Sequence, residues 1–192
     1  MPADRNAPRK TGTGAHGNHD PANDPIKHVV HQFKYQRKWS LGEMLADRLC
    51  ATERAKGLLT QTDVLVPVPL HFRRQFSRGY NQAEVLARRI GSRRNSHVIP
   101  VVHALRRTRN TESQINLHSQ ETRWHNVRGA FTLRPRSARK LRGKHVIVVD
   151  DVMTTGSTLR AVAQVLKKAE PASLSAIVLA VADPKGRGFE AV

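Results

Sequence analysis

The stretch Val146-Ile-Val-Val-Asp-Asp-Val-Met-Thr-Thr-Gly-Ser-Thr-Leu159 joins a β-branched run to two adjacent acids and a turn rich in hydroxyl groups. A short continuous run such as residues 146–149 is typical of a strand buried on both faces of a parallel sheet. Asp150 and Asp151 then emerge at the carboxyl end of this strand, where ligands bind in open α/β sheets. The stretch therefore predicts an α/β fold with a ligand site at these acids.

The turn after the two acids has the composition of a phosphate cradle. It supplies hydroxyl groups and a residue able to take positive φ, namely Thr154, Thr155, Gly156, Ser157 and Thr158. A helical apolar stripe follows over residues 159–166, and N–H groups at a helix start can hold a phosphate with help from the helix dipole. Two carboxylates beside a phosphate would repel it unless they face other groups. Ribose hydroxyls or a Mg²⁺ ion are the groups that carboxylates can bind there. The stretch thus indicates recognition of a ribose 5-phosphate.

An ordinary strand-to-helix connection would use similar residues. Ser, Thr, Asp and Gly are the residues that any such turn prefers. Proteins can also keep the cradle of a fold after losing the reaction it served. The turn alone therefore leaves open whether it binds a ligand.

Further β-branched runs alternate with helical patterns along the chain. Strands are predicted over residues 64–68, 98–105, 146–149 and 174–182, and helices over residues 41–49, 80–90 and 159–169. Pro171 marks the stop of the last helix, with Glu170 where a glycine cap would be more usual. This alternation predicts a doubly wound, mainly parallel sheet.

Four upstream segments accompany the acidic turn, and with it they resemble the ComF family of type I phosphoribosyltransferases. These segments are Asp63-Val-Leu-Val-Pro-Val-Pro-Leu70, Arg78-Gly-Tyr-Asn-Gln-Ala-Glu84, Arg106-Arg-Thr-Arg-Asn-Thr-Glu-Ser-Gln114 and Arg123-Trp-His-Asn-Val-Arg-Gly-Ala-Phe131. The resemblance covers roughly residues 26–182. It implies a type I phosphoribosyltransferase fold, the donor 5-phosphoribosyl 1-pyrophosphate (PRPP), the cofactor Mg²⁺ and a link to DNA uptake in competence.

The resemblance also implies roles for individual residues. Asp150 and Asp151 would hold the ribose hydroxyls and help place the metal, residues 154–158 would hold the 5-phosphate, and Arg78 joins the acids as a catalytic candidate. The pyrophosphate loop would consist of Pro67, Val68, Pro69 and Leu70, with Arg73 and Arg74 as nearby cations. Residues 106–126 would form a mobile loop that closes over the donor, with Gln114, Arg123 and Asn126 as its functional candidates.

The single cysteine, Cys50, is a departure from the family, because many ComF-like proteins carry an amino-terminal zinc module with four cysteines. One cysteine excludes an intramolecular disulfide and most zinc sites, so we expect no zinc. Residues 1–25 are polar and expected to be disordered, and residues 26–192 to form one phosphoribosyltransferase-like domain. No apolar run is long enough for a membrane span and the amino terminus has no secretory pattern, so a cytoplasmic location is expected.

The charge of the chain is strongly positive and unevenly distributed. The formal net charge is +18, and residues 71–142 contain 17 basic and 3 acidic residues. Such a field attracts polyanions, either a pyrophosphorylated sugar or nucleic acid. A single-stranded-DNA-handling factor and a PRPP sensor without turnover are therefore alternatives, although aromatic residues, on which bases stack, make up only 5% of the chain. The acceptor base or amine, and whether the chain forms a homodimer, stay open.

Overall fold

A sheet of four strands, in the order β1-β4-β5-β6, forms the centre of the molecule. The structure is a computed structural model, and it describes residues 32, 39–70, 79–92, 98–109, 124–125, 127–182 and 189–191. Strands β1 (Val64–Pro67), β4 (His145–Met153) and β5 (Ser173–Ala182) are parallel, whereas β6 (Phe189–Ala191) pairs antiparallel with β5. The predicted α/β architecture with a mainly parallel sheet is confirmed.

Alternate residues of β1 and β4 enter two separate hydrophobic cores, one on each face of the sheet. Val66 and Val148 belong to the first core, and Leu65 and Ile147 belong to the second. None of these four side chains is more than 3% exposed. This two-sided burial explains why the β-branched run is continuous rather than alternating with polar residues.

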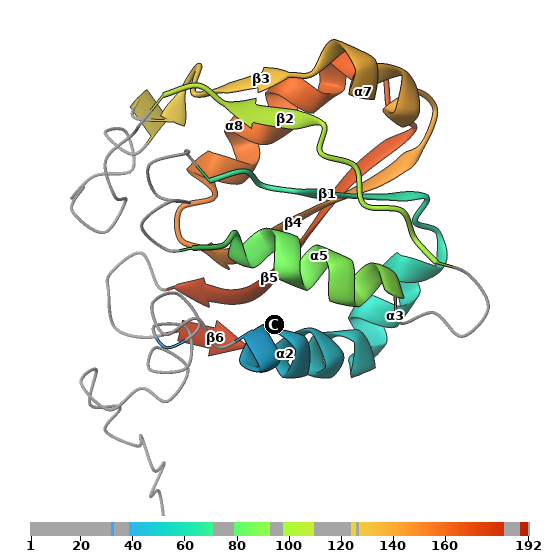
Figure 1. Ribbon diagram of the computed structural model, residues 1–192, viewed down its shortest axis with the longest axis vertical. Helices are drawn as coiled ribbons and strands as arrows, with labels where there is room; N and C mark the ends of the chain where they lie inside the picture. The colour runs from blue at the N-terminus through green and yellow to red at the C-terminus, as the bar shows by residue number, and fades with distance from the viewer. Residues whose placement is uncertain are drawn as a thin grey trace, which may run out of the picture.

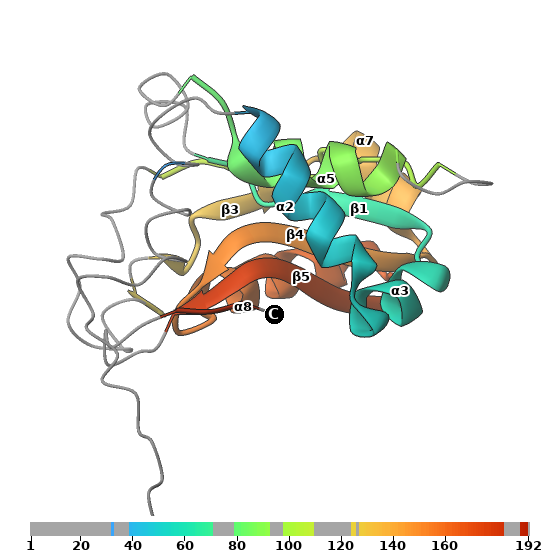
Figure 2. The ribbon, with the colours of Figure 1, turned by 90° about the horizontal axis from the view of Figure 1, so that it is seen from below.

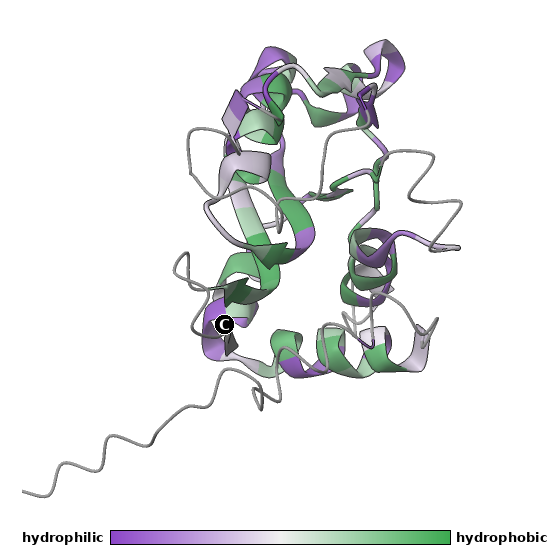
Figure 3. Cartoon of the chain, turned by 90° about the vertical axis from the view of Figure 1, so that its left-hand side faces the viewer, coloured by the Kyte–Doolittle hydropathy of each residue, from purple (hydrophilic) through white to green (hydrophobic). Residues whose placement is uncertain are grey.

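Helices cover both faces of the sheet, as Figures 1 and 2 show. On one face lie α2 (Trp39–Ala51), α3 (Glu53–Thr60) and α5 (Gln82–Ser92). On the other lie α7 (Pro135–Leu141), α8 (Ser157–Leu166) and a hairpin made of β2 (Leu105–Arg107) and β3 (Phe131–Leu133). A 3₁₀ turn, η2 (Lys167–Ala169), ends the crossover from β4 to β5. Hydrophobic colour is concentrated on the central strands in Figure 3, while the helices carry both colours.

An ion pair joins two helices of the first layer. The Arg89 guanidinium of α5 donates two hydrogen bonds of 2.8 Å to the Asp47 carboxylate of α2. This bond raises the pKa of Arg89. The two-point geometry of this ion pair links α2 to α5 with a defined orientation of the two side chains.

The predicted strand over residues 98–105 is wrong for most of its length. Residue Val101 makes one isolated parallel bridge to Leu65, and regular pairing begins only at Leu105, with β3. Pro100 has no N–H group to give to a ladder, and a bond from the Ala104 N–H to the Val102 carbonyl bends the chain. The segment forms an irregular strap along β1 rather than a strand; it buries Ile99, Ala104 and Leu105, whereas Val98 is exposed.

Candidate functional site

The two acids lie at the open carboxyl edge of the sheet. Strand β1 ends at Pro67, which is in register with Val149 of β4, so Asp150 is the first residue of β4 beyond the end of its neighbour. On the other side, Asp150 is still paired with Val178 of β5. Asp150 and Asp151 are half-buried. The sequence analysis placed both acids after the end of the strand, but they belong to β4, which continues to Met153 alongside β5; the edge at which they lie is open only on the side of the shorter β1.

Backbone hydrogen bonds orient both carboxylates. The Asp151 N–H donates to Asp150 Oδ1 at 2.9 Å, and the Val152 N–H donates to Asp151 Oδ1 at 2.8 Å. A carboxylate held in this way is restricted to few rotamers before any ligand arrives. The edge of the sheet beyond β1 therefore presents two positioned acids rather than two flexible ones.

Gly156 shapes the turn between β4 and α8. Its φ of 72° is left-handed, and it occupies the N-cap position of α8, where it has no side chain with which to cap the helix. Ser157, the first residue of α8, is buried, and its Oγ lies 2.8 Å from Thr155 Oγ1. Thr154, Thr155 and Thr158 are half-buried. The five predicted phosphate-binding residues thus form one compact turn at a helix start, the geometry that suits an anion.

The loop that follows β1 lies against the same edge. The Val68 N–H donates to the Val149 carbonyl at 2.9 Å, one residue before the acids. This bond places Pro67, Val68, Pro69 and Leu70, the candidates for a pyrophosphate loop, beside the end of β4. The structure therefore brings together two segments that the sequence analysis assigned to one site.

Asn81 has a positioning role that the sequence analysis missed. Its Nδ2 donates to the Val68 carbonyl at 3.0 Å, and its Oδ1 accepts from the Ala83 N–H at 3.2 Å, at the start of α5. One side chain therefore fixes both the loop after β1 and the first turn of a helix. The signal was available, because asparagine before a helical apolar stripe is a preferred N-cap.

The remaining site candidates fall outside the described part of the chain. These are Arg73, Arg74, Arg78, Gln114, Arg123 and Asn126. Of the predicted mobile loop over 106–126, Arg106 and Arg107 belong to β2 and pair with Thr132 and Phe131 of β3. Beside the far end of this segment, the Arg160 guanidinium of α8 lies 4.6 Å from the centre of the Trp124 ring.

The donor set of the site fits a magnesium ion that is shared with a phosphorylated ligand. Asp150 and Asp151 offer hard oxygen donors, and Mg²⁺ in proteins commonly binds one or two carboxylates together with substrate phosphates and water. Among the described residues no group of three or more His, Cys, Asp or Glu side chains could hold a metal by itself. The described residues also include no helix long and apolar enough to cross a membrane.

The chain is similar to several known proteins. Residues 44–190 match the family profile described as phosphoribosyl transferase domain. The chain is 32% identical over 148 residues to "Competence protein F" of Haemophilus influenzae, covering 76% of this chain and 63% of that protein. It is 36% identical over 147 residues to "DNA utilization protein YhgH" of Escherichia coli strain K12, covering 74% and 61%. The chain thus spans less than two thirds of the length of these relatives.

A solved structure of the glutamine PRPP amidotransferase from Bacillus subtilis, complexed with ADP and GMP, is also similar. It matches with a TM-score of 0.47 and 20% sequence identity, over 78% of this chain and 30% of that chain.

Proposed function

The chain belongs to the phosphoribosyl transferase domain family, and from that premise we propose that it binds PRPP with Mg²⁺ and transfers the phosphoribosyl group to a base or amine. The observation that supports this most is the segment from Asp150 to Thr158, which combines two positioned acids near the carboxyl end of β4 with a helix start that has no side-chain cap. The acids suit the ribose 2- and 3-hydroxyls, and the turn suits the 5-phosphate.

The proposed transfer is a substitution at C1 of the ribose. The C1–O bond to pyrophosphate breaks, a bond from the acceptor nitrogen to C1 forms, and the acceptor proton passes to solvent or to a base. Positive charge develops on the ribose ring while negative charge grows on the leaving group. When bound, Mg²⁺ supplies charge stabilisation to the departing pyrophosphate.

In this proposal the residues of the chain bind and orient the donor. Asp150 and Asp151 hold the ribose hydroxyls, and their negative charge favours the developing cationic ring. The loop of residues 67–70, held to β4 by the Val68 bond, positions the pyrophosphate, with Arg73, Arg74 and Arg78 as its cations. Asn81 is a positioning residue, because it acts through the Val68 carbonyl.

A second candidate function is handling of single-stranded DNA. The concentration of 17 basic residues within 71–142 favours it, as do the names of two relatives, a competence protein and a DNA utilization protein. A PRPP sensor without turnover is compatible with the same donor site. DNA handling and PRPP binding depend on different residues of the chain, so they can be tested separately.

Calorimetric titration of PRPP into the protein, with and without Mg²⁺, tests the donor site. We expect saturable, metal-dependent binding, after which bases and amines can be screened for pyrophosphate release. Metal-dependent binding without release for any acceptor would favour the sensor. Absence of PRPP binding at millimolar ligand would refute the donor site and leave the basic region as the leading functional surface.

A further inference from the structure

A groove with a volume of about 550 Å³ lies between the strap along β1 and α7. Val101, Val102 and His103 of the strap form one wall, and residues of the segment 134–140 form the other. None of the residues assigned to the donor site lines it. We propose that this groove binds an extended, acidic peptide segment of a partner protein, which adds to the strap as a further strand.

The strap provides an open backbone edge. The Leu65 N–H donates to the Pro100 carbonyl at 3.0 Å, and the Val102 N–H donates to the Leu65 carbonyl at 2.8 Å. In this parallel pairing Val101 is the residue opposite Leu65, so its own N–H and carbonyl point away from β1. Within the described part of the chain, these two groups of Val101 have no hydrogen-bond partner. An unpaired strand edge is the place where an extended peptide adds to a sheet.

The start of α7 closes this edge beyond Val101. The Arg134 N–H donates to the Ala104 carbonyl at 2.8 Å, and Ser137 Oγ donates to the His103 carbonyl at 3.3 Å. The edge therefore stays open at Val101, where the groove lies, and a bound chain would run between the strap and α7.

The wall formed by α7 supplies positive charge that no acid neutralises. Arg136 and Lys140 are exposed and four residues apart, so they lie on the same side of α7. Among the described residues, neither has a hydrogen-bond or ion-pair partner. Arg134 Nε donates to the Leu105 carbonyl at 3.3 Å, which orients the guanidinium without neutralising it. No acidic residue lines the described groove, so its charge is complementary to that of aspartate and glutamate side chains.

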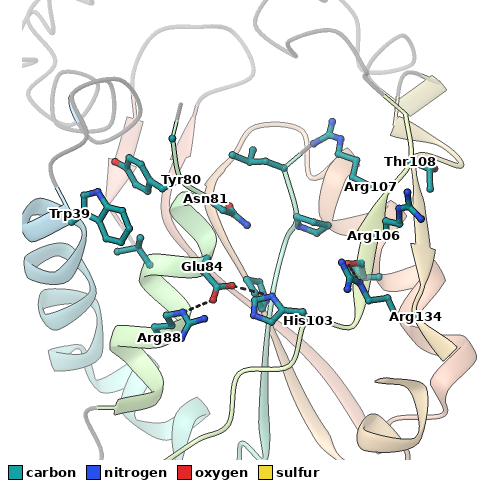
Figure 4. A pocket seen from close by; sticks show the side chains of 16 residues that line it. Trp39, Tyr80, Asn81, Glu84, Arg88, His103, Arg106, Arg107, Thr108 and Arg134 are labelled. Carbon is teal, nitrogen blue, oxygen red and sulfur yellow. Dashed lines mark hydrogen bonds and ion pairs between the residues drawn. The ribbon is translucent and has the colours of Figure 1, made fainter. Parts of the chain in front are cut away.

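His103 does not add to this charge, because it already has an acidic partner. Its Nδ1 lies 3.2 Å from Glu84 Oε2, and Glu84 is also paired with Arg88 (Figure 4). The side chain of His103 thus contacts α5, while its carbonyl accepts from Ser137 of α7. Contacts with both helices hold this wall of the groove in place before a partner binds, which lowers the cost of binding.

An acidic peptide matches the groove better than a single-stranded nucleic acid does. Single strands gain much of their binding from bases stacked on aromatic rings, and no Phe, Tyr or Trp lines the described groove. Its uncharged part is instead apolar, with Pro135 and the half-buried Val101 and Val102. Apolar contacts, cations and an open backbone edge together suit a strand in which apolar and acidic side chains alternate.

A fluorescein-labelled hexapeptide in which glutamate and valine alternate is the probe for this site. Fluorescence anisotropy at about 0.15 M salt measures its binding to the protein, and we expect saturation. The same peptide with lysine in place of glutamate should bind at least about 10-fold more weakly, because it meets cations of like charge. Equal affinity for the two peptides would overturn the proposal.

Variants of α7 locate the site on the protein. Arg136→Gln with Lys140→Gln should weaken binding of the acidic peptide by about 10-fold, because two ion pairs are lost. The matched control is Arg139→Gln, which removes an exposed arginine of α7 that does not line the groove and should change the affinity by less than about 2-fold. Thermal unfolding of each variant checks that the fold is intact. An equal loss in the control would mean that the peptide responds to overall charge and not to the groove, which would contradict the proposal.

Backbone methylation of the peptide distinguishes strand addition from a purely electrostatic contact. Successive N–H groups of a strand point to opposite edges, so only every second N–H of the peptide can face Val101. One peptide carries N-methyl groups on its valines, and a second carries them on its glutamates. One of the two should bind at least about 10-fold more weakly than the parent peptide, because it loses a hydrogen bond and presents methyl groups to the strap. Equal binding of all three peptides would exclude strand addition.

Failure of the acidic peptide to bind at millimolar concentration would refute the proposal. The proposal is also wrong if a single-stranded oligonucleotide binds with a dependence on Arg136 and Lys140 while the peptide does not bind, because the groove would then contact nucleic acid. No residue assigned to the donor site takes part in this test, so its failure would leave the proposed transferase function standing.

Discussion

Gly156 is the residue on which the shape of the β4–α8 turn depends. Its φ of 72° is the left-handed region, and a Cβ built there would meet only Met153 Sδ, at 3.8 Å. A side chain would therefore fit the space but not the backbone conformation. The cost of substitution at this position is conformational rather than steric.

Gly156→Ala should lower the free energy of unfolding by about 1 kcal/mol, because alanine is strained at positive φ. The matched control is Gly57→Ala, in the middle of α3, where a Cβ has nothing within 4 Å. That change should raise the free energy of unfolding by about 0.5–1 kcal/mol. Urea denaturation of both variants measures the two effects, and the same sign for both would contradict the assigned conformations.

Asp150→Asn with Asp151→Asn should abolish Mg-PRPP binding while the protein stays folded. The neutral amides remove the charge that attracts the metal, yet each can still accept the backbone hydrogen bond made by the residue that follows. Calorimetry measures the binding, and thermal unfolding measures the stability. Unchanged affinity for PRPP would mean that the acids are not part of the donor site.

Asp63 ties together the beginnings of β1 and β4. Its Oδ2 accepts from the His145 N–H at 2.8 Å, and its Oδ1 lies 3.5 Å from Lys144 Nζ. The backbone bond from His145 lowers the pKa of Asp63, with a further contribution from the Lys144 charge, although partial burial opposes the shift. The stabilisation from this group is thus present above its unfolded-state pKa and is lost as the pH falls through the folded-state pKa.

Asp63→Ala should therefore lower Tm by roughly 2–4 °C at pH 7, because a charge-assisted hydrogen bond is lost. The difference in Tm between the two proteins should stay constant from pH 8 to about pH 5 and shrink below about pH 4. Scanning calorimetry across this range measures it. A difference that grows toward acid pH would contradict the assigned pKa direction.

At the scale of elements, β4 was predictable because residues 146–149 are buried on both faces, and β5 because of its apolar run from Ile177 onward. Long β-branched runs carry that signal, whereas β2 and β3 have only three residues each and no readable period. Helix α7 was missed because only Leu141 of its seven residues is buried. Helix α3 was missed although Thr52 caps it, accepting from the Ala55 N–H at 3.3 Å, a signal that the sequence contains.

Glu170 illustrates how tertiary structure overrides a local preference. It takes a positive φ of 51° where a glycine was expected. Its carbonyl accepts from the Gly143 N–H at 2.9 Å, and its carboxylate lies 2.7 Å from Arg142 Nη2. These two contacts with the segment before β4 hold a conformation that glutamate seldom adopts by itself.

The candidate site was predicted in its local parts but not as a whole. The acids and the hydroxyl turn are adjacent in the sequence, so their pattern is readable without a structure. A pocket of about 670 Å³ beside the loop after β1, lined by Trp39, Tyr80 and Arg134 among others, depends on how α2, α5 and the hairpin pack, which no sequence spacing reveals. The structure therefore adds the contacts between described residues that lie far apart in the sequence.

At the scale of the whole molecule, the positive charge has a consequence that does not depend on the donor site. A formal net charge of +18 attracts polyanions. The described part of the basic region includes Arg106 and Arg134, both exposed, and several exposed basic residues of α7, namely Arg136, Arg139 and Lys140. This surface is the place to look for contacts with DNA phosphates.

A labelled single-stranded oligonucleotide should bind at 50 mM salt and lose about 100-fold in affinity at 200 mM, the loss expected for about five phosphate contacts. Fluorescence anisotropy at several salt concentrations gives the slope. An excess of unlabelled oligonucleotide of a different sequence should compete equally, because phosphate contacts carry no sequence information. No binding at 50 mM salt would exclude the DNA-handling function.

A crystal structure of the protein with Mg²⁺ and PRPP would test the central claim most directly. We predict that the 5-phosphate lies in the turn of residues 154–158 and that the ribose hydroxyls lie against Asp150 and Asp151. The pyrophosphate is expected beside residues 67–70, next to the end of β4. Electron density for PRPP away from Asp150 and Asp151, with the turn lacking phosphate, would contradict the account.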